Sequence, residues 1–282
     1  MKVALCYSGQ INRFWDAYQN HLQAFKIDDQ VDIFIYTSDA ITQKKGMQPG
    51  IPPKDGVVID YLPGHTGWRK MLGAYGTIYN VELEELAKKI NQTCGDRLKK
   101  IVIENEDINE DNNEIEKITK WEWLKKRQLY KMHACNKLMR EYEREQNIKY
   151  DLVIRSRFDS SFKLSIDAKK IIDFAGGSEN KIFVFGGWKC PPANCFMDHY
   201  LFDGFAMATP PVMDIFCSLY EKEKAYPPME KYKQYQEDWG DNVEYQLYRH
   251  IQENNINIYY LNDPTKQLDS PHCGRWLYSV IR

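Results

Sequence analysis

The stretch from Tyr150 to Asp159, YDLVIRSRFD, decides the fold that this sequence predicts. Its apolar part, Leu152–Ile154, is typical of a buried strand, and charged residues follow it at once. In an extended chain alternate side chains share a face, so Arg155, Arg157 and Asp159 are expected on one side. In open α/β sheets the ligand lies outside the carboxyl ends of the strands. The stretch therefore predicts a strand that ends at a ligand.

The side chains at this strand end suit a phosphorylated ligand that carries a metal. Arginine forks bind phosphate oxygens in bidentate geometry, so Arg155 and Arg157 are the candidate phosphate contacts. A carboxylate is a ligand for a hard divalent cation, and Asp159 is the candidate for that role. The alternative is a salt-bridge cluster on an edge strand, because the pattern Arg-x-Arg-x-Asp is short.

Length, charge and cysteine content restrict the class of protein. The 282 residues fit one large α/β domain, or a core with a smaller appendage. The formal net charge of -2 gives no overall basic field, so neither nucleic acid nor an anionic membrane is expected as a partner. The seven cysteines are scattered and odd in number, so disulfides are not expected. No apolar leader and no run of about twenty apolar residues is present, which indicates a cytoplasmic protein without a membrane span.

The start of the sequence has the order of a Rossmann-like unit. A short apolar strand, Val3–Cys6, stops at Gly9, and an amphipathic helix follows over about Phe14–Phe25. Backbone amides and the helix amino terminus at such a turn attract phosphate or a nucleotide, so Gly9, Gln10 and Arg13 are candidate binding residues. A dinucleotide fold would have G-x-G-x-x-G here, and the single glycine argues against NAD.

Three later segments of the first half bear on the site. Ser38 follows the strand Val31–Tyr36 and could hydrogen-bond a base or ribose, or could only cap the next turn. A helix predicted over about Lys120–Gln146 leads into the Arg155 strand, and its Lys131 is a candidate phosphate contact, the alternative being surface exposure. The acidic run Glu104–Glu116, ENEDINEDNNEIE, has little to bury and is predicted to be a mobile, solvated surface loop.

Four segments together resemble nucleotide-sugar glycosyltransferases of the GT-A fold: KVALCYSGQ, DIFIYTSD, the helix with Gln128-x-x-Lys131, and YDLVIRSRFD. The resemblance covers most of the chain, and it is strongest to glycosyltransferases of large DNA viruses of algae, the chlorella viruses. It implies a single α/β domain over residues 1–282, with a Rossmann-like half and a mixed central sheet flanked by helices. Residues 1–159 would bind the nucleotide sugar, and residues 160–282 would bind the acceptor.

The same resemblance implies roles for particular residues. Arg157 stands where the D-x-D motif of the family has its first Asp, while Asp159 keeps the second, which commonly holds the divalent metal. The ending His272-Cys-Gly-Arg-Trp is similar to the H-x-G-x-x-K-P-W ending of retaining glycosyltransferases related to glycogenin, although it is two residues shorter and lacks the Pro. His272 would then be a metal ligand and Arg275 a phosphate contact. Mn²⁺ or Mg²⁺ suits oxygen ligands with at most one imidazole.

The implied function is a hexosyl- or pentosyltransferase that moves a sugar from a UDP-sugar to a glycan or glycoprotein acceptor. A metal ion and preplaced arginines would stabilise the charge that grows on the departing diphosphate, and a retaining reaction would need little more. An inverting enzyme also needs a carboxylate base, for which Asp203 and Glu244 are the candidates; each could instead be a helix cap or a ligand of a sugar hydroxyl. The alternative function is nucleotide-sugar or carbohydrate binding without turnover, which the replacement of an Asp by Arg157 motivates.

Overall fold

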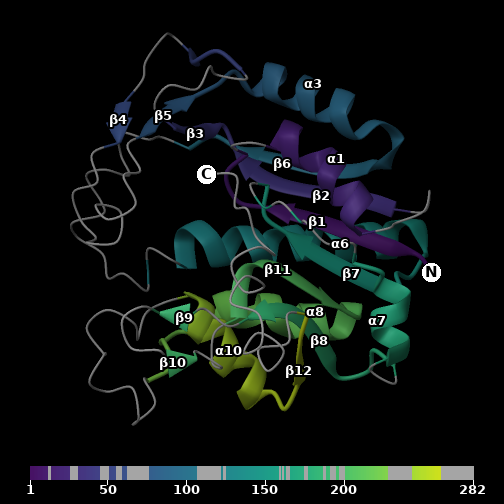
Figure 1. Cartoon of the computed structure of the whole chain (residues 1–282). Coiled ribbons are helices and arrows are strands. Elements are labelled where there is room, and N and C mark those ends of the chain that lie inside the picture. The colour runs from purple at the N-terminus through teal and green to yellow at the C-terminus, as the bar shows by residue number, and fades with distance from the viewer. Residues whose placement is uncertain are drawn as a thin grey trace.

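The computed structural model describes the chain apart from residues 12–13, 26–30, 45–50, 55–58, 62–75, 107–121, 123–124, 159, 161, 163–165, 175–176, 187–188, 191–194, 197–200, 228–242 and 262–282. The described residues form a seven-stranded sheet with helices on both faces and two small sheets beside it (Figure 1). In order across the large sheet the strands are β12 (Asn257–Tyr260), β8 (Lys181–Gly186), β11 (Leu201–Ala208), β7 (Leu152–Ser156), β1 (Val3–Ser8), β2 (Val31–Ser38) and β6 (Leu98–Glu104).

One strand gives the large sheet its mixed character. Strand β11 runs antiparallel to both of its neighbours, β7 and β8, whereas the other neighbouring pairs are parallel. The carboxyl ends of the parallel strands therefore lie at one edge of the sheet, and the start of β11 lies at that same edge. The predicted mixed central sheet flanked by helices is confirmed.

Helices cover the two faces of the sheet in separate sets (Figure 1). On one face the core includes residues of α1 (Phe14–Ala24), α3 (Leu83–Cys94) and α7 (Ala168–Phe174). On the other face it includes residues of α6 (Tyr130–Gln146), α8 (Pro210–Cys217) and α10 (Val243–Glu253). Because both faces are covered, all six residues of β1 are buried, which explains why the sequence shows continuous apolar runs here and no alternation.

The strands extend past their apolar runs. The sequence predicted strands over Val3–Cys6, Val31–Tyr36 and Leu152–Ile154, and each observed strand continues for two more residues, ending at Ser8, Ser38 or Ser156. Backbone hydrogen bonds of the ladder do not depend on the side chain, so pairing continues where the apolar pattern stops. Each strand thus carries a hydroxyl to the carboxyl edge.

Smaller elements complete the described chain. A three-stranded sheet has the order β3 (Ala40–Lys44), β5 (Gly76–Asn80), β4 (Ile59–Tyr61), and β9 (Lys189–Cys190) pairs with β10 (Cys195–Phe196). Strand β3 begins directly after β2, and β9 begins shortly after β8, so both small sheets follow carboxyl ends of large-sheet strands. Short 3₁₀ segments occupy Gly95–Arg97 and Ser218–Glu221, and a π-helical segment occupies Lys125–Leu129.

The predicted helix over Lys120–Gln146 begins irregularly. The π-helical segment Lys125–Leu129 runs directly into α6, which ends at Asn147 in the left-handed conformation, with φ at 50°. Short π segments often occur at functional sites. Within the part of the chain that the structure describes, no helix combines the length and apolar character needed to cross a bilayer.

Candidate functional site

The carboxyl edge of the large sheet brings together polar side chains from several strands. Tyr7 of β1 lies in register with Ser156 of β7, and Ser8 lies in register with Tyr36 of β2. The backbone N–H of Arg157 donates to the carbonyl of Gly204 at 3.0 Å, which aligns the end of β7 with the start of β11. Two groups of polar residues form here, and we name each after its central carboxylate.

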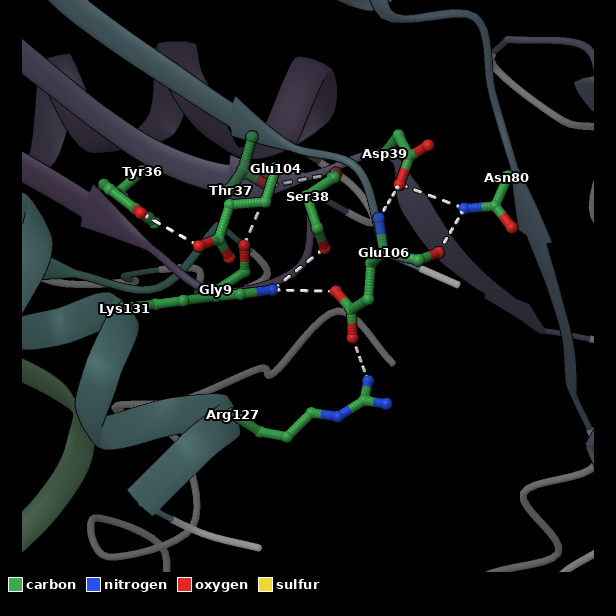
Figure 2. A network of polar contacts seen from close by, with 10 residues as sticks. All are labelled: Gly9, Tyr36, Thr37, Ser38, Asp39, Asn80, Glu104, Glu106, Arg127 and Lys131. Atoms are coloured by element: carbon green, nitrogen blue, oxygen red, sulfur yellow. Dashed lines mark hydrogen bonds and ion pairs between the residues drawn. The ribbon is translucent and has the colours of Figure 1, made fainter. Parts of the chain in front are cut away.

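The Glu106 group lies at the ends of β2 and β6 (Figure 2). The Nζ atom of Lys131, at the start of α6, donates to Ser38 Oγ and to Glu106 Oε2, each at 2.9 Å. Arg127 forms an ion pair with the other carboxylate oxygen, Glu106 Oε1. Burial alone would raise the pKa of Glu106, but the charges of Lys131 and Arg127 outweigh it, and the pKa lies below its usual 4.5. Glu106 is therefore an ionised carboxylate held between two cations.

Asp39 connects this group to the neighbouring small sheet (Figure 2). Its Oδ1 atom accepts hydrogen bonds from the backbone N–H of Glu106 at 2.8 Å and from Nδ2 of Asn80 at 3.0 Å. Asn80 Nδ2 also donates to the Glu106 carbonyl at 2.8 Å. Asp39 is 2% exposed, so these contacts fix the backbone on which Glu106 stands.

The turn after β1 is held to the end of β2. The hydroxyl of Thr37 donates to the carbonyl of Gly9 at 2.8 Å, and the Gly9 N–H donates to the carbonyl of Tyr36 at 3.3 Å. Gly9 has a φ of 120°, a conformation that a side chain would strain. The glycine at this position is thus explained by the backbone of the turn, and its contact with a nucleotide stays a prediction.

The Asp203 group lies at the end of β7 and the start of β11. Oδ2 of Asp203 accepts from Nη1 of Arg157 at 3.2 Å and also from Nε2 of Gln128. Asp203 is 3% exposed, whereas the Arg157 side chain is 38% exposed. A buried carboxylate therefore holds an arginine that solvent and ligands can reach.

Arg155 is the most unusual residue of the Asp203 group. It is 3% exposed, and it lies in register with Cys6 and Ala206, whose side chains belong to the core beneath α6 and α8. Burial lowers the pKa of Arg155, while the nearby charge of Asp203 opposes this change. Its Nε and Nη1 atoms are buried and have no hydrogen-bond partner among the residues that the structure describes. A guanidinium with buried, unpaired donors is costly to the fold.

The π-helical segment and the first turn of α6 that follows it contact the two groups. Gln128 reaches Asp203, and Lys131, three residues later, reaches Glu106 and Ser38. The predicted Gln128-x-x-Lys131 segment therefore lies at the carboxyl edge. Two of the three N–H donors of Lys131 are engaged by Ser38 and Glu106, which leaves at most one for a ligand.

The candidate residues predicted from sequence divide into three sets. Those at the carboxyl edge are Gly9, Gln10, Ser38, Lys131, Arg155, Arg157 and Asp203. Those outside the described residues are Arg13, Asp159, His272 and Arg275. Glu244 lies in the first turn of α10 and is partly buried. The described ranges contain no cluster of three His, Cys, Asp or Glu side chains able to hold a metal, and both predicted metal ligands fall outside those ranges.

Sequence reasoning missed the centre of the Glu106 group. The acidic run Glu104–Glu116 was predicted to be a solvated loop, and for its first residues that prediction is wrong. Glu104 ends β6, and Glu106 has a side chain only 13% exposed between its two cations. The available signal was position, because Glu104 follows the apolar run Ile101–Ile103 just as Ser38 follows the run Val31–Tyr36. Residues 107–116 lie outside the described part of the chain.

Comparison with known proteins identifies no family for this chain and finds similarity only to solved structures. No protein-family model and no curated protein matches this sequence. Among solved structures, mouse xyloside xylosyltransferase 1 in its apo form is similar over 100% of this chain and 93% of its own, with 9% sequence identity and a TM-score of 0.38. A similarity of that size assigns neither a function nor a site, so the chemistry has to be argued from the carboxyl edge itself.

Proposed function

We propose that the carboxyl edge binds the diphosphate of a nucleoside-diphosphate sugar, most simply a UDP-sugar, and that the protein transfers the sugar to a glycan acceptor. The observation that carries the proposal is Arg155, a buried guanidinium with two donors that no described residue pairs, beside the more exposed Arg157. An unpaired buried donor costs about 1–3 kcal/mol, and a diphosphate oxygen would remove that cost. Two adjacent guanidiniums also match the two phosphates of such a ligand.

The arrangement suits stabilisation of a leaving group. As a glycosidic bond to phosphate breaks, negative charge grows on the departing diphosphate, and cations fixed in advance lower the barrier. Asp203 serves this purpose by accepting a hydrogen bond from Arg157, and burial in the core restricts the side chain of Arg155. Neither side chain then has to reorganise when the bond breaks. Ser38 lies two strands away, at the end of β2, and Lys131 of α6 reaches it; the nucleoside part of the donor would extend in that direction.

The proposal includes a divalent cation, which two residues would hold. Asp159 offers carboxylate oxygens and His272 an imidazole nitrogen, a set that suits Mn²⁺ or Mg²⁺. A bound cation would supply further positive charge to the diphosphate. Arg155 and Arg157 act on the phosphate oxygens directly, so their contribution does not depend on the cation.

Calorimetric titration tests the binding half of the proposal. UDP is titrated into the protein with and without Mn²⁺, and uridine is titrated as the matched ligand without phosphate. We expect UDP to bind and uridine to bind at least about tenfold more weakly, because the guanidiniums recognise phosphate. Absence of UDP binding in both the presence and the absence of Mn²⁺ would contradict the proposal.

A second function, binding of the nucleotide sugar without turnover, is supported by the state of Asp203. Oδ2 of this carboxylate already accepts hydrogen bonds from Arg157 and Gln128, so that oxygen is not available to an acceptor hydroxyl while these contacts are made. Release of free sugar from a UDP-sugar donor separates the two functions. Turnover that is abolished by Asp159→Ala supports the transferase, whereas binding with no sugar release supports the binding protein.

A further inference from the structure

Helix α1 holds the chain that leaves β7 through polar side chains, on the face of the sheet opposite α6. The Nε2 atom of His21 lies 2.6 Å from the carbonyl oxygen of Ser160. The side chain of Asn20 bonds both backbone groups of Phe162, accepting from its N–H at 2.7 Å and donating to its carbonyl at 2.8 Å. These contacts cross about 140 residues of sequence, with separations of 139 and 142, so they join parts of the chain that meet only in the fold.

The hydrogen bonds of His21 determine its tautomer. A carbonyl oxygen only accepts, so Nε2 of His21 carries the proton that it donates to Ser160. In the neutral ring Nδ1 is then an acceptor, and the hydroxyl of Tyr7 donates to it at 2.8 Å. His21 is 0% exposed, and its ring stacks on Tyr7 with an interplanar angle of 12°. The imidazole is thus fixed in orientation between β1 and the segment after β7.

Asn20 acts on Phe162 as a neighbouring strand would. An amide side chain has one acceptor and one donor group, and here both meet the backbone of a single residue. The Phe162 ring is buried against Phe25, Phe205 and Phe185, with centroid distances of 5.0, 5.4 and 5.9 Å. Both the backbone and the side chain of Phe162 are therefore anchored.

Phe158 is anchored closer to the site. Its ring stacks on Tyr7 at 5.5 Å and meets Phe14 edge-on at 5.3 Å. Phe158, Ser160 and Phe162 follow one another at intervals of two residues, and each contacts α1 or β1. Arg157 directly precedes the first of these anchors, so the position of its backbone depends on them.

We propose that Asn20 and His21 are positioning residues of the donor site. They lie on the far side of the sheet from Arg155 and do not touch the ligand; they fix the backbone that carries the two arginines. The inference rests on the proposed function, because it gives these residues a role in binding a diphosphate. A shift of about 1 Å in such a site can change function about a hundredfold, so small losses of anchoring are measurable.

The test compares four variants by calorimetric titration of UDP in the presence of Mn²⁺, well below the unfolding temperature of each. Asn20→Ala and His21→Ala remove the anchors, and we expect each to raise the dissociation constant about tenfold or more. His21→Gln places an amide N–H near the position of Nε2, so it should recover most of the affinity that His21→Ala loses. The matched control is Ala17→Gly, which weakens buried α1 without touching Ser160 or Phe162. It should lower the unfolding temperature and leave the dissociation constant unchanged.

The outcomes separate this inference from the proposed function. If the wild type does not bind UDP, the proposed function fails. If the wild type binds and both alanine variants bind equally well, or if Ala17→Gly weakens binding as much as they do, the positioning role is wrong. Should the alanine variants not fold, Tyr7→Phe and Asn20→Asp decide, since each removes a single hydrogen-bond donor. Wild-type affinity in both of these would overturn the inference.

Discussion

Nη1 of Arg157 lies 3.2 Å from Oδ2 of Asp203, and this contact joins the end of β7 to the start of the antiparallel strand β11. The carboxylate is buried and the arginine is partly exposed. An exposed ion pair contributes little to stability, because water competes for both charges. Here the buried partner restricts the exposed one, so the contact fixes where the guanidinium lies more than it stabilises the fold.

Replacing Asp203 by Ala should destabilise the protein by about 1–3 kcal/mol, because the donors of Gln128 and Arg157 lose their acceptor and Arg155 loses a compensating charge. Urea unfolding of Asp203→Ala, Arg157→Ala and the double variant gives the coupling between the two residues. We expect a coupling of about 0.5–1 kcal/mol, as befits a half-exposed pair. Additive effects of the two substitutions would show that Arg157 is not held by Asp203.

Glu106→Gln should reduce stability by about 1–3 kcal/mol at neutral pH, because Lys131 is left buried without its carboxylate. The pKa of Glu106 is lower in the folded protein than its usual 4.5, so the unfolded chain takes up the proton first as the pH falls. The stabilisation is therefore complete above pH 4.5 and is lost as the pH drops through the lower folded pKa. Urea unfolding of both proteins across this range checks the prediction, and a difference that persisted undiminished in strong acid would contradict it.

His250 should cause a second loss of stability as the pH falls, in a higher pH range than the loss caused by Glu106. Burial lowers its pKa below 6.5, although its Nε2–H donates to the Ile215 carbonyl at 2.8 Å, which opposes the shift. Its stabilisation is present above pH 6.5, where the unfolded chain is also neutral, and is lost as the pH falls through the folded pKa. His250→Gln should remove this dependence from urea unfolding measured between about pH 5 and 7.5. Glu106→Gln, whose window lies below pH 4.5, is the control that should keep it.

The strands and the carboxyl edge followed from sequence because their signal is local. A strand buried on both faces requires a continuous apolar run, and Val3–Cys6 and Val31–Tyr36 are such runs. Alternation within the extended chain likewise predicted that Arg155 and Arg157 share a side, and both lie within electrostatic reach of Asp203. These features needed no knowledge of the rest of the chain.

The Glu106 group could not be predicted in the same way, because its members meet only in the fold. Arg127 and Lys131 lie 21 and 25 residues from Glu106, and Ser38 lies 93 residues from Lys131. In the sequence, Glu106 is one of many acidic residues in the run Glu104–Glu116, and the composition of that run predicts that all of them are exposed to solvent. The antiparallel direction of β11 is a similar case, since the residues of a strand do not record the direction of its neighbours.

Arg155→Met should change stability and UDP binding in opposite directions. Methionine occupies a similar volume without charge, so the variant removes a desolvated guanidinium with two unpaired donors. Replacing costly buried charge by an apolar side chain is often stabilising, and we expect a gain of about 1–3 kcal/mol in the free energy of unfolding without ligand. The same variant should lose UDP binding in calorimetry, because a phosphate contact is gone.

Arg155→Lys is the matched control for Arg155→Met. Lysine keeps the charge but not the bidentate fork, so this variant should bind UDP with intermediate affinity. A strongly destabilised Arg155→Met variant that still bound UDP like the wild type would show that this arginine serves the core and not the ligand.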